Sequence, residues 1–557
     1  MENKFDYIIV GGGTAGCVLA SRLSADPRRK VLLLEAGPDV VPGHEPVDIL
    51  DTYPTSYYNL DYVWKDLFGS WTGKISQPIK QAKILGGGSS VMGMVALRGT
   101  ADDYNEWDKL GASGWDWTNV LPYFRKLESD TDYSGPLHGD SGPVPISRIP
   151  RKDLPPFHLR MEEYAKAAGI QLAADLNGNF ADGLGVAPQS VFKDRRASAS
   201  ICYLDRNVRK RENLTIITQA NATRIAFEGR RATGVSAIVD NTCQHFFSRE
   251  VIVTAGALRT PALLMRSGVG PATHLYESEI PVVFNSLGVG KNLQNHQIIY
   301  TVAHMKRAFR PLKTARRHTT TIDRYSSNLD GAPPSDMYLS LISQTGWHEL
   351  GTYLSSLAAV NLKPFSRGQL TLDPLSPSSK SVIAFNFLSD ERDILRLCEG
   401  VRRIDRYLKS AELRGIYHAV VPVTNPASFR AFNNINTFNA IKAKAVALLI
   451  DAFPVLGKVV LSAMSDEVSS FDNIIADDDK LRNFIANSVT GMAHPVGTCK
   501  MGKESDKNAV VGGDGKVFGL DCLRVADASI MPTIPRGNTN IPTLMIAEKI
   551  SNTILSE

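Results

Sequence analysis

No apolar stretch in this sequence is long enough to cross a membrane as a helix. Such a helix needs about eighteen or more consecutive apolar residues, and the nearest candidate, residues 445–464, is interrupted by Asp451, Pro454 and Lys458. We therefore expect no transmembrane segment. The simplest interpretation of 445–464 is a helix–turn–helix packed on the rest of the protein. The alternative is a patch in weak interfacial contact with a membrane that admits an apolar substrate.

Cysteines are few and form no pattern. The six thiols are scattered without a Cys-x-x-Cys pair, so free cysteines in a reducing compartment are expected rather than a disulfide framework. No secretory leader is visible before the first apolar run, residues 5–10. Cytoplasmic residence is the expectation that follows.

Concentrated charge and clustered metal ligands are missing too. The net charge is only +5 over 557 residues, and no basic tract is interleaved with aromatic residues, so nucleic acid is not an expected partner. No His/Cys cluster with ligand spacing indicates a metal site.

The composition, 43% hydrophobic and 21% charged, is that of a globular protein, and a chain of this length predicts two domains. The sequence indicates no oligomeric state.

A glycine-rich turn near the start is the most informative pattern present. An apolar run leads into Gly-Gly-Gly-Thr-Ala-Gly, which begins at Gly11. In such a turn Gly11 permits the tight bend after a strand, Gly13 lets the backbone approach a pyrophosphate, and Gly16 allows a helix to pack closely on the strand. Thr14 and Ala15 would open that helix, whose unpaired N–H groups and dipole favour a phosphate.

A second apolar run, residues 31–34, ends on Glu35. A carboxylate at this place accepts hydrogen bonds from ribose hydroxyls and argues against a ribose 2′-phosphate, so the expected ligand is FAD or NAD rather than NADP. A glycine-rich turn alone is a weak signal. Here strand, helix, second strand and acid follow one another in register, which favours a dinucleotide site.

Residues 83–94 form a second glycine-rich segment, with three consecutive glycines followed by two serines. The N–H groups of such a run can form a concave nest around an anion or a flat ring. A flexible linker is the alternative, but apolar residues crowd both sides of the run. The pattern therefore favours a second binding loop.

Two polar motifs near the end of the chain carry side chains suited to alcohol oxidation. One is Ala-His-Pro-Val-Gly-Thr, with His494, and the other is Gly-Asn-Thr-Asn, with Asn538. Oxidising an alcohol removes a proton from oxygen and a hydride from carbon, and a neutral imidazole can accept the proton. An amide N–H can stabilise the developing alkoxide without changing its own charge.

Over its whole length the sequence resembles the glucose–methanol–choline (GMC) oxidoreductase family. The similarity is carried by residues 82–96, 256–270, 288–296 and 523–532. Within the family it is greatest to members that oxidise furfuryl and aryl alcohols. The resemblance implies noncovalent FAD, because Val91 stands where some members attach the flavin through a His. Met92 stands where the family usually has Asn or His, a departure that leaves the backbone turn possible.

The resemblance also implies a role for each motif. His494 would be the base that takes the hydroxyl proton and Asn538 the second catalytic group, while the hydride passes to the flavin N5. His296 lies in a family segment and is interpreted as structural. The implied cofactor-binding residues are Gly11, Gly13, Thr14, Ala15, Gly16, Glu35, Ala36, Gly88, Val91, Gly93, Ala222, Asp527, Ala528 and Asn540.

The implied reaction is FAD-dependent oxidation of a primary alcohol, aromatic or allylic, to the aldehyde, with O2 as the acceptor and H2O2 as its product. One alternative is a quinone- or dye-linked alcohol dehydrogenase. Another is a lyase of the hydroxynitrile type, since a fold does not fix a function. In furfural-oxidising members a bulky aromatic residue precedes the catalytic His, so Ala493 predicts a roomier pocket here, with residues 445–464 as a candidate wall or mouth.

The expected fold class is α/β, or α+β overall, with domains that are discontinuous in sequence. Apolar alternation predicts strands at 214–217, 223–227, 234–239, 250–254 and 370–372. Helices are predicted at 17–23, 120–127, 260–266, 390–410 and 543–555. We assign a Rossmann-like FAD-binding domain to residues 1–155, 212–300 and 485–557. A substrate-binding domain with an antiparallel sheet and flanking helices takes 156–211 and 301–484.

Overall fold

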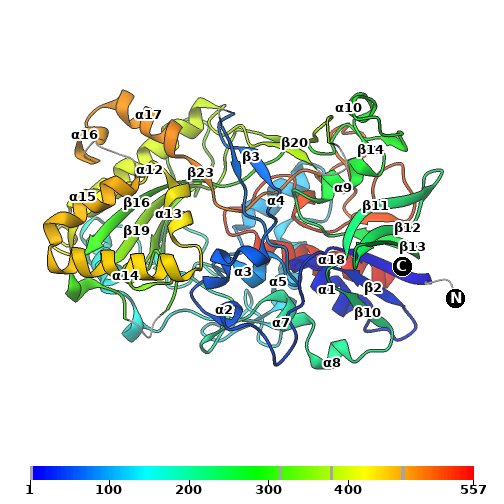
Figure 1. Cartoon of the computed structure of the whole chain (residues 1–557), viewed down its shortest axis with the longest axis horizontal. Coiled ribbons are helices and arrows are strands. Elements are labelled where there is room, and N and C mark those ends of the chain that lie inside the picture. Colours follow the sequence, from blue (N-terminus) through cyan, green and yellow to red (C-terminus); the bar gives the residue numbers. More distant parts are fainter. Residues whose placement is uncertain (1–3, 74, 313–315, 377–379, 466–470) are drawn as a thin grey trace.

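Two seven-stranded sheets lie at opposite ends of an elongated molecule (Figure 1). The computed structural model describes residues 4–73, 75–312, 316–376, 380–465 and 471–557. The chain passes between the two ends several times, so that its first and last segments meet in the same half. This mixed α/β architecture with two domains confirms the predicted fold class.

The first sheet is a parallel dinucleotide-binding sheet with an antiparallel extension. Its path is β10 (Leu214–Ile217), β2 (Val31–Leu34), β1 (Lys4–Val10), β13 (Thr242–Val253), β12 (Arg231–Val239) and β11 (Asn221–Glu228), and β24 (Leu523–Val525) also pairs with β13. The long strand β13 pairs in parallel with β1 and, through its last residues, with β24, while its first half pairs antiparallel with β12. A strand from the end of the chain thus completes the sheet begun at residue 4.

Helices from both ends of the chain cover this sheet. Helix α1 (Thr14–Leu23) follows β1 directly and packs against α18 (Asn540–Ser556), which in turn contacts α5 (Trp117–Leu127). Nearly all of α1 is buried because its small and aliphatic side chains lie between the sheet and α18. The C-terminal helix is therefore a structural neighbour of the first glycine turn.

The second sheet is antiparallel. Its path is β22 (Tyr417–Pro422), β16 (Gln297–Met305), β19 (Leu354–Asn361), β18 (Met337–Ile342), β17 (Thr319–Tyr325) and β7 (Gly183–Val186), and β23 (Thr490–Gly491) also pairs with β16. Helix α12 (Glu391–Lys409) packs on β19, and α15 (Pro454–Ser465) packs on β22. The pairing of β23 with β16 brings the segment that carries His494 against residues 294–298.

Most local predictions are confirmed. Strands β10 to β13, helix α9 (Thr260–Arg266) and helix α12 lie where alternation and helical periodicity predicted them. Helix α5 begins three residues earlier than predicted, at Trp117, because Asp116 caps it by accepting from the N–H groups of Thr118 and Asn119. The predicted helix–turn–helix at 445–464 is also confirmed, as α14 (Thr437–Ala452) followed by α15.

Segment 156–211 contributes to both halves of the molecule. Strand β7 joins the second sheet, whereas α7 (Ala199–Tyr203) packs on α1. The residue bounds of the two domains stay a prediction. Among the described residues, no helix has the length and apolarity that crossing a membrane requires.

Candidate active site

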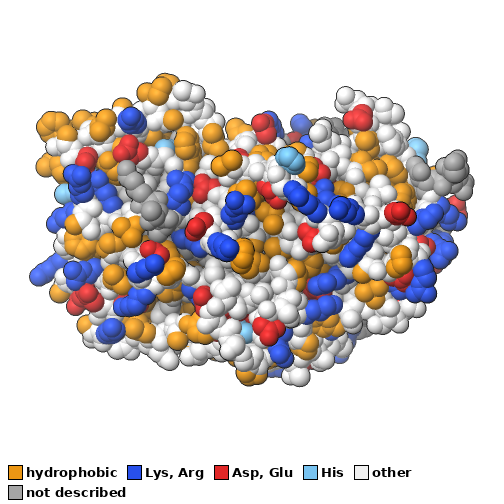
Figure 2. Space-filling view, turned by 90° about the horizontal axis from the view of Figure 1, so that it is seen from below, with side chains coloured by type: hydrophobic (Ala, Val, Ile, Leu, Met, Phe, Trp, Pro, Cys, Tyr) orange, Lys and Arg blue, Asp and Glu red, His pale blue; other side chains and the backbone are white. Residues whose placement is uncertain are grey.

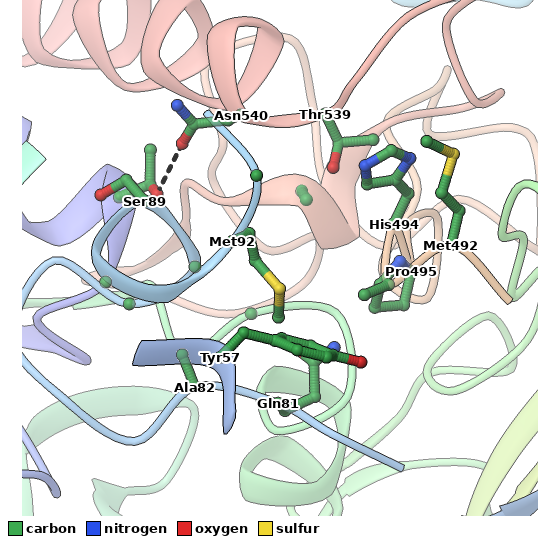
Figure 3. A pocket seen from close by; sticks show the side chains of 18 of the residues that line it. Tyr57, Gln81, Ala82, Ser89, Met92, Met492, His494, Pro495, Thr539 and Asn540 are labelled. Atoms are coloured by element: carbon green, nitrogen blue, oxygen red, sulfur yellow. Dashed lines mark hydrogen bonds between the residues drawn. The ribbon is translucent and has the colours of Figure 1, made fainter. Parts of the chain in front are cut away.

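A single cavity of about 440 Å³ joins the glycine turn, the second glycine-rich loop and the His494 segment. Volumes of this order are typical of sites for small molecules and cofactors. Figure 3 shows Met92 and Tyr57 projecting into the same space as His494. Its walls come from β1, β2, α1 and the loops after β13 on one side, and from β16, β18 and β19 on the other.

The glycine turn leaves the amino end of α1 without a side-chain cap. Gly13 occupies the N-cap position, and no side chain accepts from the first N–H groups of the helix. A Cβ on Gly11 would lie 2.6 Å from the Thr254 carbonyl oxygen, and one on Gly16 would lie 2.0 Å from the Gly11 carbonyl oxygen. Only glycine fits these positions, and the uncapped helix end suits a phosphate.

The second glycine loop packs directly on the first. Gly87 has φ +55°, and a Cβ there would lie 2.8 Å from the Gly13 Cα. The Arg196 guanidinium, which is buried, donates to the backbone carbonyls of Ser89 and Met92. Burial lowers the pKa of Arg196 to about 9. Arg196 thus stabilises the backbone of this loop. No sequence pattern indicated this role.

Two backbone N–H groups hold the Glu35 carboxylate in place. One carboxylate oxygen accepts from Gly12 N–H at 2.8 Å and the other accepts from Gly37 N–H at 2.7 Å. Burial is the main influence on this carboxyl and raises its pKa. Each oxygen retains a second lone pair, and Glu35 lines the cavity, so the residue has the acceptor capacity that a ribose hydroxyl needs.

Three hydrogen bonds tie the end of the chain to this cradle. The Thr14 hydroxyl donates to Asn540 Oδ1 at 3.0 Å, which joins the starts of α1 and α18. Asp527 accepts from Gly256 N–H at 2.7 Å and from the Thr260 hydroxyl at 2.6 Å. These bonds position the C-terminal segment along the wall of the cavity.

The structure brings nearly all of the sequence-predicted site residues to this cavity. Those that line it are Gly11, Gly13, Thr14, Ala15, Glu35, Ala36, Gly88, Gly93, Ala222, His494, Asp527, Ala528, Asn538 and Asn540. Gly16 and Val91 do not line it: Gly16 is packed against the Gly11 backbone, and the Val91 side chain is fully buried. Met92, the residue after Val91, does line the cavity.

His494 faces the cavity in a network of three side chains. Its Nε2 lies 3.2 Å from Asn538 Nδ2, and its Nδ1 lies 2.9 Å from His296 Nδ1. The backbone N–H of His494 donates to Asn295 Oδ1 at 2.9 Å. Since residues 490–496 run antiparallel to residues 294–298, backbone pairing places the two imidazoles side by side.

The hydrogen bonds fix the tautomer of each ring. His296 Nε2 lies 3.0 Å from the Pro535 carbonyl oxygen, which can only accept, so this nitrogen carries the proton. In the neutral ring His296 Nδ1 is then an acceptor, and His494 Nδ1 must donate to it. The lone pair of His494 is therefore at Nε2, where the Asn538 amide donates. His494 Nε2 is the nitrogen that faces the cavity as a base.

Burial keeps both rings neutral. Desolvation lowers the pKa of His494 to about 4. Desolvation, and then the neighbouring His494, hold the pKa of His296 well below its ordinary value. A neutral His494 is the form that can accept a proton near neutral pH. Sequence reasoning interpreted His296 as structural; its contact with His494 joins residues 198 positions apart and leaves no local signal.

The substrate side of the cavity is one face of the second sheet. The sheet residues that line it include Ile298, Tyr300, Val302, Ser340, Ile342 and Ser356. The hydroxyls of Ser340 and Ser356 are buried and have no hydrogen-bond partner in the described structure. None of residues 445–464 lines the cavity, so the expected wall from that segment is wrong; α13 (Pro426–Phe432), which precedes it, supplies Phe429 instead.

One group elsewhere has the spacing of metal ligands, formed by Glu128, Asp130 and His138. Arg98 pairs with Glu128, and Arg148 pairs with Asp130 at 2.6 Å. The His138 ring bridges the two acids, and its contact with Glu128 raises the pKa of His138. The carboxylates are already neutralised by arginine, so this cluster is an ion-pair network among the described residues.

Comparison with known proteins identifies the family of the chain. The chain matches the N-terminal and C-terminal parts of the GMC oxidoreductase family over residues 5–298 and 364–547. It is 39% identical to a 5-(hydroxymethyl)furfural oxidase of Methylovorus sp. (strain MP688), over 100% of this chain and 99% of that protein. It is 33% identical to the mitochondrial choline dehydrogenase of Mus musculus, over 99% of this chain and 90% of that protein.

A solved structure shares the whole fold. The crystal structure of pyridoxine 4-oxidase from Mesorbium loti superimposes with a TM-score of 0.81 at 25% identity, and 99% of each chain is covered. The residues that resembled a family in the sequence thus belong to a match that spans the chain. This protein is a member of the GMC oxidoreductase family, whose members bind FAD and include oxidases and dehydrogenases that act on alcohols.

Proposed function

We propose that the protein oxidises a primary alcohol to its aldehyde with noncovalently bound FAD. The observation that carries the proposal is the neutral His494 Nε2, held beside the Asn538 amide on the wall of a cavity that also contains a dinucleotide cradle. A base and a hydrogen-bond donor at one point are what proton removal from a hydroxyl needs. When bound, FAD supplies the acceptor for the substrate hydride at its N5.

The chain's own groups account for the proton. His494 Nε2 accepts the hydroxyl proton, and the resulting imidazolium keeps its Nδ1–H donated to His296. The Asn538 N–H₂, which donates to His494 Nε2 while no alcohol is bound, would donate instead to the oxygen that loses the proton and stabilise its developing charge. Both groups are partly buried in the cavity wall, and a bound alcohol would displace water from them, which strengthens each of these interactions.

The cradle fits FAD without a covalent link. The uncapped start of α1 would receive the pyrophosphate, Glu35 the ribose, and the loop around Gly88 and Gly93 the ring system. Val91 is buried and offers no nucleophile. Acid precipitation of the yellow protein should therefore leave the flavin in solution, and flavin retained in the pellet would contradict this part of the proposal.

The substrate we propose is an aromatic or allylic alcohol that carries a second polar group. Ser340 lies two residues beyond Tyr338 on β18, and the Tyr338 hydroxyl contacts the Met492 sulfur at 3.1 Å, next to the His494 segment. Since the hydroxyls of Ser340 and Ser356 are buried without partners, a polar group on the substrate would satisfy them.

The acceptor we propose is O2, with H2O2 as its product. The support is the relative named a 5-(hydroxymethyl)furfural oxidase; a quinone- or dye-linked dehydrogenase is the second candidate, because another relative is named a choline dehydrogenase. Peroxide release and dye reduction, measured with one good alcohol under the same conditions, separate the two. Faster dye reduction with little peroxide would assign the dehydrogenase. Cytoplasmic residence stays a prediction.

The non-redox alternative is separated by the same preparation. Anaerobic addition of a benzylic or cinnamyl alcohol should bleach the flavin of an alcohol-oxidising enzyme. Yellow protein that no alcohol bleaches would favour a lyase.

A further inference from the structure

Helices α14 and α15 present an apolar face to solvent at the end of the molecule farthest from the first sheet (Figure 1). Of the 25 exposed large hydrophobic side chains among the described residues, eight lie within residues 438–459. The most exposed are Val455 at 86%, Phe438 at 74% and Ile441 and Val459 at 65%. Such a concentration on a globular surface marks a contact site rather than ordinary surface.

The spacing shows that each helix has a second apolar stripe. Ala443, Ala447 and Ile450 bury one face of α14, whereas Phe438, Ile441 and Leu448 follow the helical repeat on the outer face. Helix α15 is anchored by Gly457, where a Cβ would lie 2.4 Å from the His304 ring, and by the buried Leu461. A helix with apolar stripes on opposite faces normally has both stripes covered. The outer stripes need a partner that the chain itself does not supply in the described structure.

Charge identifies the partner. Lys442, Lys444 and Lys458 are exposed on these two helices, and their only acid, Asp451, is paired with Arg310 at 2.7 Å. Figure 2 shows basic and hydrophobic side chains interspersed at the same end of the molecule, on the left. Apolar side chains flanked by lysines, with no free acid, suit the boundary between lipid headgroups and acyl chains of an anionic bilayer.

We propose that the outer face of the α14–α15 hairpin docks the protein on an anionic lipid bilayer. Phe438, Ile441, Val455 and Val459 enter the headgroup region, and the three lysines contact lipid phosphates. No part of the hairpin crosses the bilayer. Helix α13 packs on α15 and lines the cavity through Phe429, so the docked face adjoins the substrate side of the active site.

Flotation of the full FAD-loaded chain with vesicles tests the proposal without reference to activity. One set of vesicles is phosphatidylcholine alone, and the other is phosphatidylcholine and phosphatidylglycerol in equal parts. The wild type should float with the second set and less with the first, and added salt should weaken that difference. A charge variant, K442E/K444E/K458E, should bind anionic vesicles at least about a hundredfold more weakly, since each lysine near the surface contributes about fivefold.

An apolar variant and two controls complete the design. F438N/V455N/V459N should lower binding at least about tenfold, because three side chains no longer enter the bilayer. Y276N/L375N and K109E/K166E/K210E remove comparably exposed groups elsewhere and should bind as the wild type does. No flotation of the wild type, or equal binding by all variants, would overturn the proposal. So would a concentration-dependent dimer that the apolar variant dissociates while neither protein binds vesicles.

Discussion

At the scale of single residues, the base His494 depends on an acceptor at its far nitrogen. His296→Leu removes that acceptor, which allows the wrong tautomer and leaves the imidazolium less stabilised. Flavin reduction by an alcohol should then slow at least about tenfold, a part of the contribution that a general base makes. His296→Gln is the matched control, because its amide can donate to the Pro535 carbonyl and accept from His494 Nδ1.

The pH profile of flavin reduction shows whether His296 positions His494 or only supports the fold. Because burial lowers the pKa of His494 to about 4, the wild-type rate should be level near neutrality and fall as pH drops through about 4, where the base becomes protonated. Loss of the acceptor makes His494 a weaker base, so the acid limb should move to lower pH in His296→Leu and return in His296→Gln. Equal losses in both variants with an unmoved profile would contradict the assignment.

Ala493 sets the space beside the base. Its φ of 59° lies in the left-handed region, a strain of about 1–2 kcal/mol that Ala already carries through its Cβ, so the main effect of a bulky replacement is to fill the pocket. The wild type should prefer cinnamyl and benzyl alcohols to furfuryl alcohol, and Ala493→Trp should lose at least about tenfold in kcat/KM on the larger two. Ala493→Asn tolerates this backbone without filling the space and serves as control. A wild type that prefers the smallest alcohol, with no loss on larger ones in the Trp variant, would count against this pocket.

At the scale of elements, Glu548 joins the last helix to the first. Its buried carboxylate accepts from Arg22 on α1 at 2.6 Å and from the Tyr203 hydroxyl on α7 at 2.9 Å. Glu548→Gln should lower the free energy of unfolding by about 2 kcal/mol, less than a fully buried pair because Arg22 is partly exposed. Urea denaturation measures this, and Glu277→Gln, at an acid 63% exposed, should change stability by less than about 0.5 kcal/mol. Equal small effects would show that the ion pair does not hold α18.

The helices and strands also show how much of the structure the sequence could predict. The first glycine turn, α9 and α12 follow from patterns within a few dozen residues, because periodicity and turn chemistry act locally. The contact of His296 with His494, the Arg196 support of the loop and the wall from α13 depend on contacts between residues far apart in the chain. For the same reason residues 445–464 were predicted correctly as two helices and incorrectly as a pocket wall: their periodicity fixes the helices but not their neighbours.

At the scale of the whole molecule, neutral histidines with lowered pKa values make the free energy of unfolding depend on pH. Burial lowers the pKa of His304, His318, His348 and His494 to about 4 each, below the value of about 6.5 in an unfolded chain. The unfolded state therefore binds more protons, and this contribution is complete above about pH 6.5 and is lost as pH falls toward about 4. His138 acts oppositely, since its raised pKa favours the folded state at low pH.

Urea denaturation between about pH 6.5 and about pH 4 should show the free energy of unfolding falling as pH falls. The fall should be on the order of 1 kcal/mol per pH unit for each buried histidine. His304→Phe is the informative variant, because both of its ring nitrogens are buried without a hydrogen-bond partner. Its slope against pH should be shallower than that of the wild type. An unchanged slope would mean that His304 is protonated to the same extent in both states.

The most direct test of the central claim is anaerobic flavin reduction by a benzylic or cinnamyl alcohol, followed as loss of the yellow colour in single turnover. The wild type should bleach. His494→Ala should keep its FAD and bleach at least about 10²-fold more slowly, and Asn538→Ala should slow by roughly 10²-fold. His318→Asn, at another histidine of the cavity wall with a pKa lowered by desolvation, should change the rate by less than about tenfold, below the usual scale of base loss. Near-normal bleaching in both His494→Ala and Asn538→Ala would contradict the account.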